Sequence, residues 1–143
     1  MDKKYTGDAD FVETATGVRE DLPGYLLDES KAVIGCAMEV LNVLGHGLLE
    51  KPYEEALVVE FELRGIPHRQ QPRYDVVYKG RPIGYFVPDL IVYEHIVVDT
   101  KVIDRIGPHE TGQMLNYLRV SGLEMGIVLN FSKPRLEWRR VAL

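Results

Sequence analysis

Two apolar stretches of the sequence, each interrupted by a carboxylate, restrict the fold most strongly. Asp89 and Asp99 lie in the run GYFVPDLIVYEHIVVDTKVID, which otherwise alternates like strand residues. A carboxylate in the middle of a strand is costly to bury unless something compensates its charge. Lys101 follows Asp99 by two residues, so both side chains lie on one face of a strand. If the strands pair with Asp89 opposite Asp99, the two carboxylates meet there and repel one another unless a cation lies between them.

Oxygen ligands of this kind suit Mg²⁺ or Mn²⁺, which keep several of their waters. The alternative interpretation is a structural salt bridge at the sheet surface. In that case Asp99 pairs with Lys101, and Asp89 pairs with an arginine. The short pattern alone does not separate the metal site from the salt bridge.

The periodicity of the remaining sequence predicts an α/β fold with a mixed sheet. Two helices come first, then three strands on short connections that form an antiparallel meander, then a helix and two more strands. Gly65 and Gly122 end helices, and Pro108 begins one. The expected helices run from a cap at Asp28 or Ser30 to Leu44, from Pro52 to Arg64 and over 108–120. The expected strands cover 74–78, 83–93, 95–103, 125–131 and 136–143, the last of them at an edge of the sheet.

A third group of polar residues occurs on the helix after Lys101. His109, Gln113 and Tyr117 are four residues apart and therefore share one helix face. An ordinary amphipathic helix, with the Tyr117 ring packed on the core, would also explain this spacing. Upstream, the segment GHGLLEKPYEEA contains Gly47, Glu50 and Tyr53. A carboxylate at Glu50 is favoured at the start of a helix regardless of function, and Glu54 and Glu55 are expected to be solvated.

The arrangement Pro88-Asp89, a gap and Asp99-Thr100-Lys101 resembles the signature of the PD-(D/E)XK nuclease superfamily. Gln113 and Tyr117 resemble the QxxxY motif that follows the catalytic lysine in its RecB-like members. Gly47, Glu50 and Tyr53 resemble the motif of the small GxxExxY family within that superfamily. The resemblance covers about Glu29 to Leu143 and implies a restriction-endonuclease-like three-layer sandwich.

The resemblance also implies roles for these residues. Asp89, Asp99 and the Thr100 carbonyl would hold Mg²⁺ or Mn²⁺, with Glu50 as a third acid aimed at the metal. Lys101 would orient or activate the attacking water. Gln113 and Tyr117 would support that lysine, and Tyr53 and His109 would lie near the substrate.

Charge divides the chain into an acidic head and a neutral body. Residues 1–29 hold eight acidic and three basic side chains, so this segment carries the whole net charge of −5. We expect residues 1–24 to be an extension with little order and residues 25–143 to form the nuclease-like domain. A neutral body gives no positive evidence for a nucleic-acid partner. The candidate phosphate contacts form two sets, Arg64, His68, Arg69 and Arg73, and Lys133, Arg135, Arg139 and Arg140.

Compartment and assembly are expectations from composition. No secretory signal or membrane-spanning run is visible, and the lone Cys36 lies in an apolar helical pattern, so a cytoplasmic location is expected. The expected edge strand at 136–143 could pair with a second copy to form a homodimer.

Three functions fit these observations. The first is a metal-dependent nuclease acting on DNA or RNA. The second is an accessory module that keeps the fold and binds a protein or nucleic-acid partner without cutting. The third is a hydrolase of a small phosphorylated or nucleotide substrate.

Overall fold

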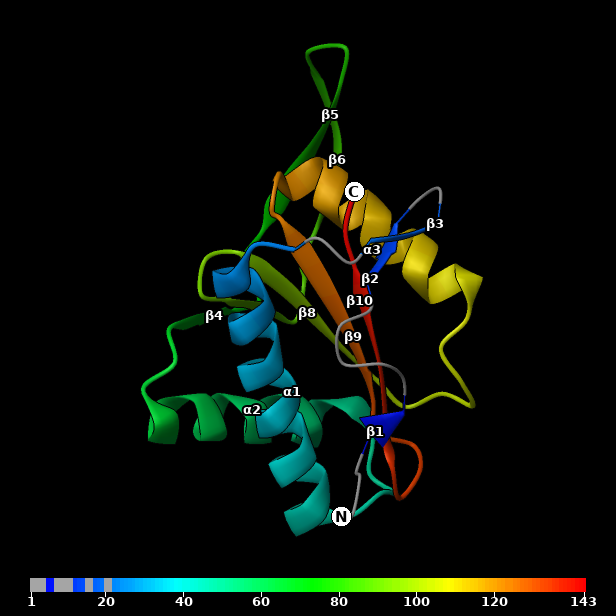
Figure 1. Ribbon diagram of the computed structural model, residues 1–143. Helices are drawn as coiled ribbons and strands as arrows, with labels where there is room; N and C mark the ends of the chain where they lie inside the picture. Colours follow the sequence, from blue (N-terminus) through cyan, green and yellow to red (C-terminus); the bar gives the residue numbers. More distant parts are fainter. Residues whose placement is uncertain (1–4, 7–11, 15–16, 20–21) are drawn as a thin grey trace.

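The computed structural model shows one mixed β-sheet with helices on both faces (Figure 1). It describes residues 5–6, 12–14, 17–19 and 22–143. The strand order is β3-β2-β10-β9-β8-β7-β4, and β1 also pairs with β10. The helices are α1 (Gly24–Leu44), α2 (Glu50–Arg64) and α3 (Pro108–Ser121). The strands of this sheet are β1 (Tyr5–Thr6), β2 (Val12–Thr14), β3 (Gly17–Arg19), β4 (His68–Gln70), β7 (Leu90–Val92), β8 (Ile96–Lys101), β9 (Met125–Asn130) and β10 (Leu136–Val141).

The central strands are buried on both faces, which creates two separate cores. Alternate residues such as Val98 and Ile127 pack with α1 and α2, whereas Val97 and Val128 pack with Met114 and other residues of α3. This alternation follows from the period of two along a strand. The expected α/β three-layer arrangement is therefore confirmed. No helix in the described part of the chain is both long enough and apolar enough to cross a bilayer.

The helix boundaries follow the predicted breaks, with two corrections at the start. Gly65 and Gly122 adopt left-handed conformations directly after α2 and α3, as expected. The helix α1 begins at Gly24, earlier than predicted. The residue at its N-cap is Pro23, and neither Asp28 nor Ser30 is the cap. The start of α2 is Glu50, two residues before Pro52.

The predicted strand over 83–93 is wrong. The chain forms β6 (Arg81–Phe86), leaves the extended ladder near Pro88 and forms β7. Proline has no N–H to donate to a ladder, so it interrupts the strand there. As a result β6 pairs with β5 (Tyr74–Tyr78) in a separate two-stranded sheet, which projects from the body at the top of Figure 1. In the main sheet β8 instead pairs antiparallel with β7, and β7 pairs antiparallel with β4, a strand that was not predicted.

The prediction that residues 136–143 form an edge strand is also wrong. On one side β10 pairs antiparallel with β9, and on the other it pairs in parallel with β1 and β2. Residues 5–6, 12–14 and 17–19 thus form short strands, and Val12 is fully buried. The edge that was expected to receive a second copy is covered by the chain's own leading segment.

Close packing between α3 and β9 depends on Gly126. A Cβ added there would lie 2.2 Å from Cγ and 2.3 Å from Sδ of Met114, which is 1% exposed. Real Cβ atoms do not approach so closely, so either the helix or the methionine would have to move. The interior leaves little room for such a shift because it is densely packed.

We expect Gly126→Ala to lower the free energy of unfolding by about 1–3 kcal/mol, the usual cost of overpacking a core. Urea denaturation measures this change. Gly84→Ala is the control, because a Cβ there meets nothing within 4 Å. In the Met114→Ala background, the Gly126→Ala change should cost less than in the wild type, because the atoms that the new Cβ would meet are gone. Equal stability of the Gly126→Ala protein and the wild type would contradict this account of the interface.

Candidate metal centre

The pairing of β7 with β8 brings the two predicted aspartates together. Leu90 pairs with Val98, so the register continued by one residue places Asp89 opposite Asp99. Asp89 lies in a bend directly before β7, not inside a strand as predicted. Its Oδ2 accepts hydrogen bonds from the Thr100 backbone N–H at 2.8 Å and from the Thr100 hydroxyl at 2.7 Å. These two bonds fix the Asp89 carboxylate against β8.

The electrostatics of Asp99 are strongly perturbed. The pKa of Asp99 is raised to about 7: burial is the largest cause, the negative charge of Asp89 adds to it, and Lys101 opposes both effects. A hydrogen bond between the two carboxyl groups acts in the same direction as the burial. Two carboxylates this close resist ionising together. Because its pKa is raised, Asp99 holds a proton more firmly than an exposed aspartate does, and that proton reduces the repulsion.

Lys101 is held between the carboxylates and α3. Its Nζ lies 3.1 Å from Asp99 Oδ2 and donates to Gln113 Oε1 at 3.3 Å. Burial opposes the lysine's charge, but Asp99, Tyr117 and Asp89 outweigh burial, and the pKa of Lys101 is raised. The ammonium group therefore stays charged near neutral pH. It can donate hydrogen bonds but cannot accept a proton there.

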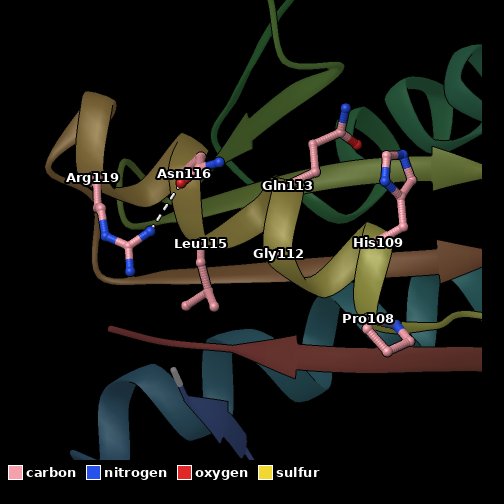
Figure 2. Close-up of a pocket in the computed structure, with 7 residues that line it drawn as sticks. All are labelled: Pro108, His109, Gly112, Gln113, Leu115, Asn116 and Arg119. Carbon is pink, nitrogen blue, oxygen red and sulfur yellow. Dashed lines mark hydrogen bonds between the residues drawn. The ribbon is translucent and has the colours of Figure 1, made fainter. Parts of the chain in front are cut away.

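Gln113 and Tyr117, which were predicted to share a face of α3 because they are four residues apart, both lie near Lys101. Burial raises the pKa of Tyr117, and the charge of Asp99 adds to this effect. The ring of Tyr117 stacks on Phe86 with centroids 4.4 Å apart. His109 is exposed and points to the same side of α3 as Gln113, at the rim of a shallow hollow of about 610 Å³ (Figure 2). The hollow is lined by Pro108, His109, Gly112, Gln113, Leu115, Asn116 and Arg119.

Glu50 and Tyr53 lie in surroundings of two different kinds. Glu50 is exposed at the first residue of α2. Over the described ranges, no group of three or more His, Cys, Asp and Glu residues is placed to hold a metal ion, and the role of Glu50 as a third acid stays a prediction. Tyr53 is fully buried, stacks on Phe131, donates its hydroxyl proton to Gly45 O at 2.7 Å and accepts from the Leu48 N–H at 3.2 Å. The GxxExxY tyrosine therefore fixes the loop before α2 instead of facing a substrate.

Glu54, which was expected to be solvated, is instead 3% exposed. Its Oε2 accepts hydrogen bonds from the side-chain amides of Gln70 at 2.6 Å and Gln71 at 3.1 Å. The backbone N–H of Gln71 in turn donates to the carbonyl of Asp89 at 2.9 Å. Glu54 thus supports the segment next to Asp89. Its spacing from the buried Leu57 and Phe61 on the same face of α2 was the signal that could have identified it.

Most of the candidate phosphate contacts are already occupied or buried. Arg64 pairs with Glu60 at 2.6 Å, Arg69 with Glu94 at 3.0 Å and Arg73 with Asp75 at 3.2 Å. His68 contacts Ile66 O at 2.9 Å. Of the second set, Lys133 lies 3.5 Å from Asp104, Arg139 lies 3.6 Å from Glu137, and Arg135 lines a second hollow. Arg140 is 1% exposed with its guanidinium 5.0 Å from the Trp138 ring centroid, so the prediction that it contacts phosphate is wrong.

The Asp99→Asn protein should be more stable than the wild type at pH 8, by several degrees in Tm, in the absence of divalent metal. Folded Asp99 keeps its proton up to about pH 7, whereas an unfolded aspartate loses it near 3.8. The stability that protonated Asp99 contributes is therefore fully present below the unfolded pKa of 3.8. This contribution falls as the pH rises and is lost above pH 7. The difference between the variant and the wild type should shrink toward pH 4.

Thermal unfolding in EDTA between pH 4 and pH 8 measures this effect. The matched control is Asp104→Asn, because Asp104 is 91% exposed. A lower Tm for Asp99→Asn at pH 8 would mean that the Asp99–Lys101 pair is a structural salt bridge.

Comparison with known proteins gives one family match. A family model described as "PD-(D/E)XK nuclease superfamily" matches residues 27–141. A solved structure titled "Crystal structure of SSO0001" is 18% identical, with a TM-score of 0.49 over 82% of this chain and 54% of that one. The chain thus spans about half the length of that protein. The search of curated proteins gives no match. On the strength of the family match, this chain belongs to the PD-(D/E)XK nuclease superfamily.

Proposed function

We propose that this protein is a divalent-metal-dependent phosphodiesterase that hydrolyses DNA or RNA. The observation that carries the proposal is the placement of Asp89 opposite Asp99 by the register of β7 with β8, with the Lys101 ammonium 3.1 Å from Asp99. Membership of the nuclease superfamily supports it. The spacing of Gly47, Glu50 and Tyr53 further supports placement in the narrower GxxExxY family, although in this chain the tyrosine is structural.

The donor set fits Mg²⁺ or Mn²⁺. Asp89 and Asp99 would hold the ion with the Thr100 carbonyl, and waters would complete its coordination. The raised pKa of Asp99 supports this assignment, because a positive charge at this point would remove the repulsion that burial intensifies. When bound, the ion supplies charge to a phosphate oxygen and increases the acidity of water.

The remaining groups act by position and charge. The attack of a water oxygen on phosphorus forms one P–O bond and breaks another; the water loses a proton, the leaving oxygen gains one, and a nucleotide hydroxyl is released. Lys101 is fixed by Asp99 and Gln113, so its free N–H can orient the attacking water or a phosphate oxygen. Because Lys101 is charged, it also stabilises the negative charge that develops on the phosphate.

We expect Asp89→Asn, Asp99→Asn and Lys101→Met each to slow cleavage at least about 100-fold, as the loss of a group that acts on the transition state does. Single-turnover assays should use single-stranded, double-stranded and branched DNA and RNA, with Mg²⁺ or Mn²⁺. The controls are Asp104→Asn and Lys31→Met, which exchange exposed residues of the same charges.

Two results would contradict the nuclease proposal. One is cleavage at the wild-type rate by the Asp99→Asn protein. The other is binding of nucleic acid by all variants with no product from any, which is the behaviour of the accessory module. A thermal shift with Mn²⁺ separates these cases from misfolding, because the two asparagine variants should lose the stabilisation and the two controls should keep it.

A further inference from the structure

The hairpin of β5 and β6 carries an exposed surface that the proposed catalytic site does not use. We call residues 73–87 the arm. It forms a sheet of its own and extends away from the three layers (Figure 1). Its large apolar and aromatic side chains are mostly exposed to solvent: Val77 59%, Tyr78 59%, Ile83 64%, Tyr85 58% and Val87 44%. So many exposed apolar groups on a small projecting element indicate a binding surface.

The charge of the arm is opposite to that of the chain. Arg73, Lys79 and Arg81 are its basic residues and Asp75 is its one acid, while the whole chain carries a net charge of −5. Cations also lie on its tyrosine rings. The Arg73 guanidinium is 4.0 Å from the Tyr85 ring centroid, and the Lys79 ammonium is 5.3 Å from that of Tyr78.

The base of the arm is fixed beside the candidate metal centre. Tyr74 stacks on Phe86 with centroids 5.4 Å apart, and Phe86 stacks on Tyr117 at 4.4 Å. Tyr117 lies close enough to Lys101 and Asp99 for their charges to act on it. A two-stranded ribbon has little stability by itself, so these stacked rings hold the arm in a defined direction. The chain then passes directly from the arm through Pro88 to Asp89.

We propose that the arm binds a single-stranded segment of the nucleic acid that crosses the ribbon. One unpaired base stacks on Tyr78 and another on Tyr85, which the register of β5 with β6 sets on opposite faces, and phosphates lie near Lys79 and Arg81 at the turn. Exposed aromatic rings with neighbouring cations are the features by which proteins hold single strands without regard to sequence. A surface for a second copy would instead be depleted in charge at its centre. This inference rests on the proposed nuclease function for the direction of the strand toward Asp89, but binding itself requires no metal.

The test is the affinity of the full chain for a fluorescent twelve-nucleotide oligothymidine, by anisotropy in EDTA. Tyr78→Leu/Tyr85→Leu keeps apolar bulk but removes the rings, and it should weaken binding at least about tenfold. Tyr78→Phe/Tyr85→Phe keeps the rings and should bind like the wild type. Lys79→Gln/Arg81→Gln should weaken binding and flatten the dependence of log affinity on log salt by about 1.4. The control is Val59→Ala/Leu63→Ala, which removes exposed apolar groups from α2.

Several outcomes would overturn the proposal. They are a wild-type protein that does not bind the oligothymidine, leucine and phenylalanine variants that bind equally, and arm variants that only convert a dimer to a monomer in sedimentation. Cleavage assays with Asp99→Asn are scored separately. A protein that binds through the arm but does not cut would therefore refute the nuclease function alone, and one that cuts with an inert arm would refute this inference alone.

Discussion

Electrostatic repulsion between two partly buried carboxyl groups is the constraint around which this structure is arranged. Asp89 and Asp99 are set opposite one another by the β7–β8 register, and burial raises the pKa of Asp99 to about 7. A protein that needed only stability could place apolar residues at these positions, since buried charges usually cost more than they return. The arrangement is understandable if a divalent cation takes the place of the proton that Asp99 holds.

Each layer of the fold contributes to holding these groups in place. From the helix on one face, Gln113 fixes Lys101, and from the other face Glu54 binds Gln71, whose backbone supports Asp89. Gly126 lets α3 approach the sheet closely enough for the first of these contacts. Functional groups therefore lie on regular elements whose own packing fixes their positions, which is what precise positioning in an active site requires.

Local chemistry in the sequence was enough to predict β8 and α3, the strand and the helix that carry Asp99, Lys101 and Gln113. A period of two placed Asp99 and Lys101 together, and a period of four placed Gln113 toward Lys101. Long-range pairing was not predictable in the same way. No residue of 136–143 indicated that β10 would pair with strands of the leading segment. The continuous apolar run around Pro88 was interpreted as one strand, although β6 ends before this proline and β7 begins after it. Tyr53 was misassigned because a motif residue and a core residue look alike until burial is known.

A crystal soaked with Mn²⁺ tests the central claim most directly. Anomalous scattering at the manganese edge shows where the ion binds without reference to activity. The account predicts one strong peak in contact with Asp89 and Asp99 that disappears in the Asp99→Asn protein. Clear density for both aspartates with no peak between them, or a peak that survives the substitution, would contradict it.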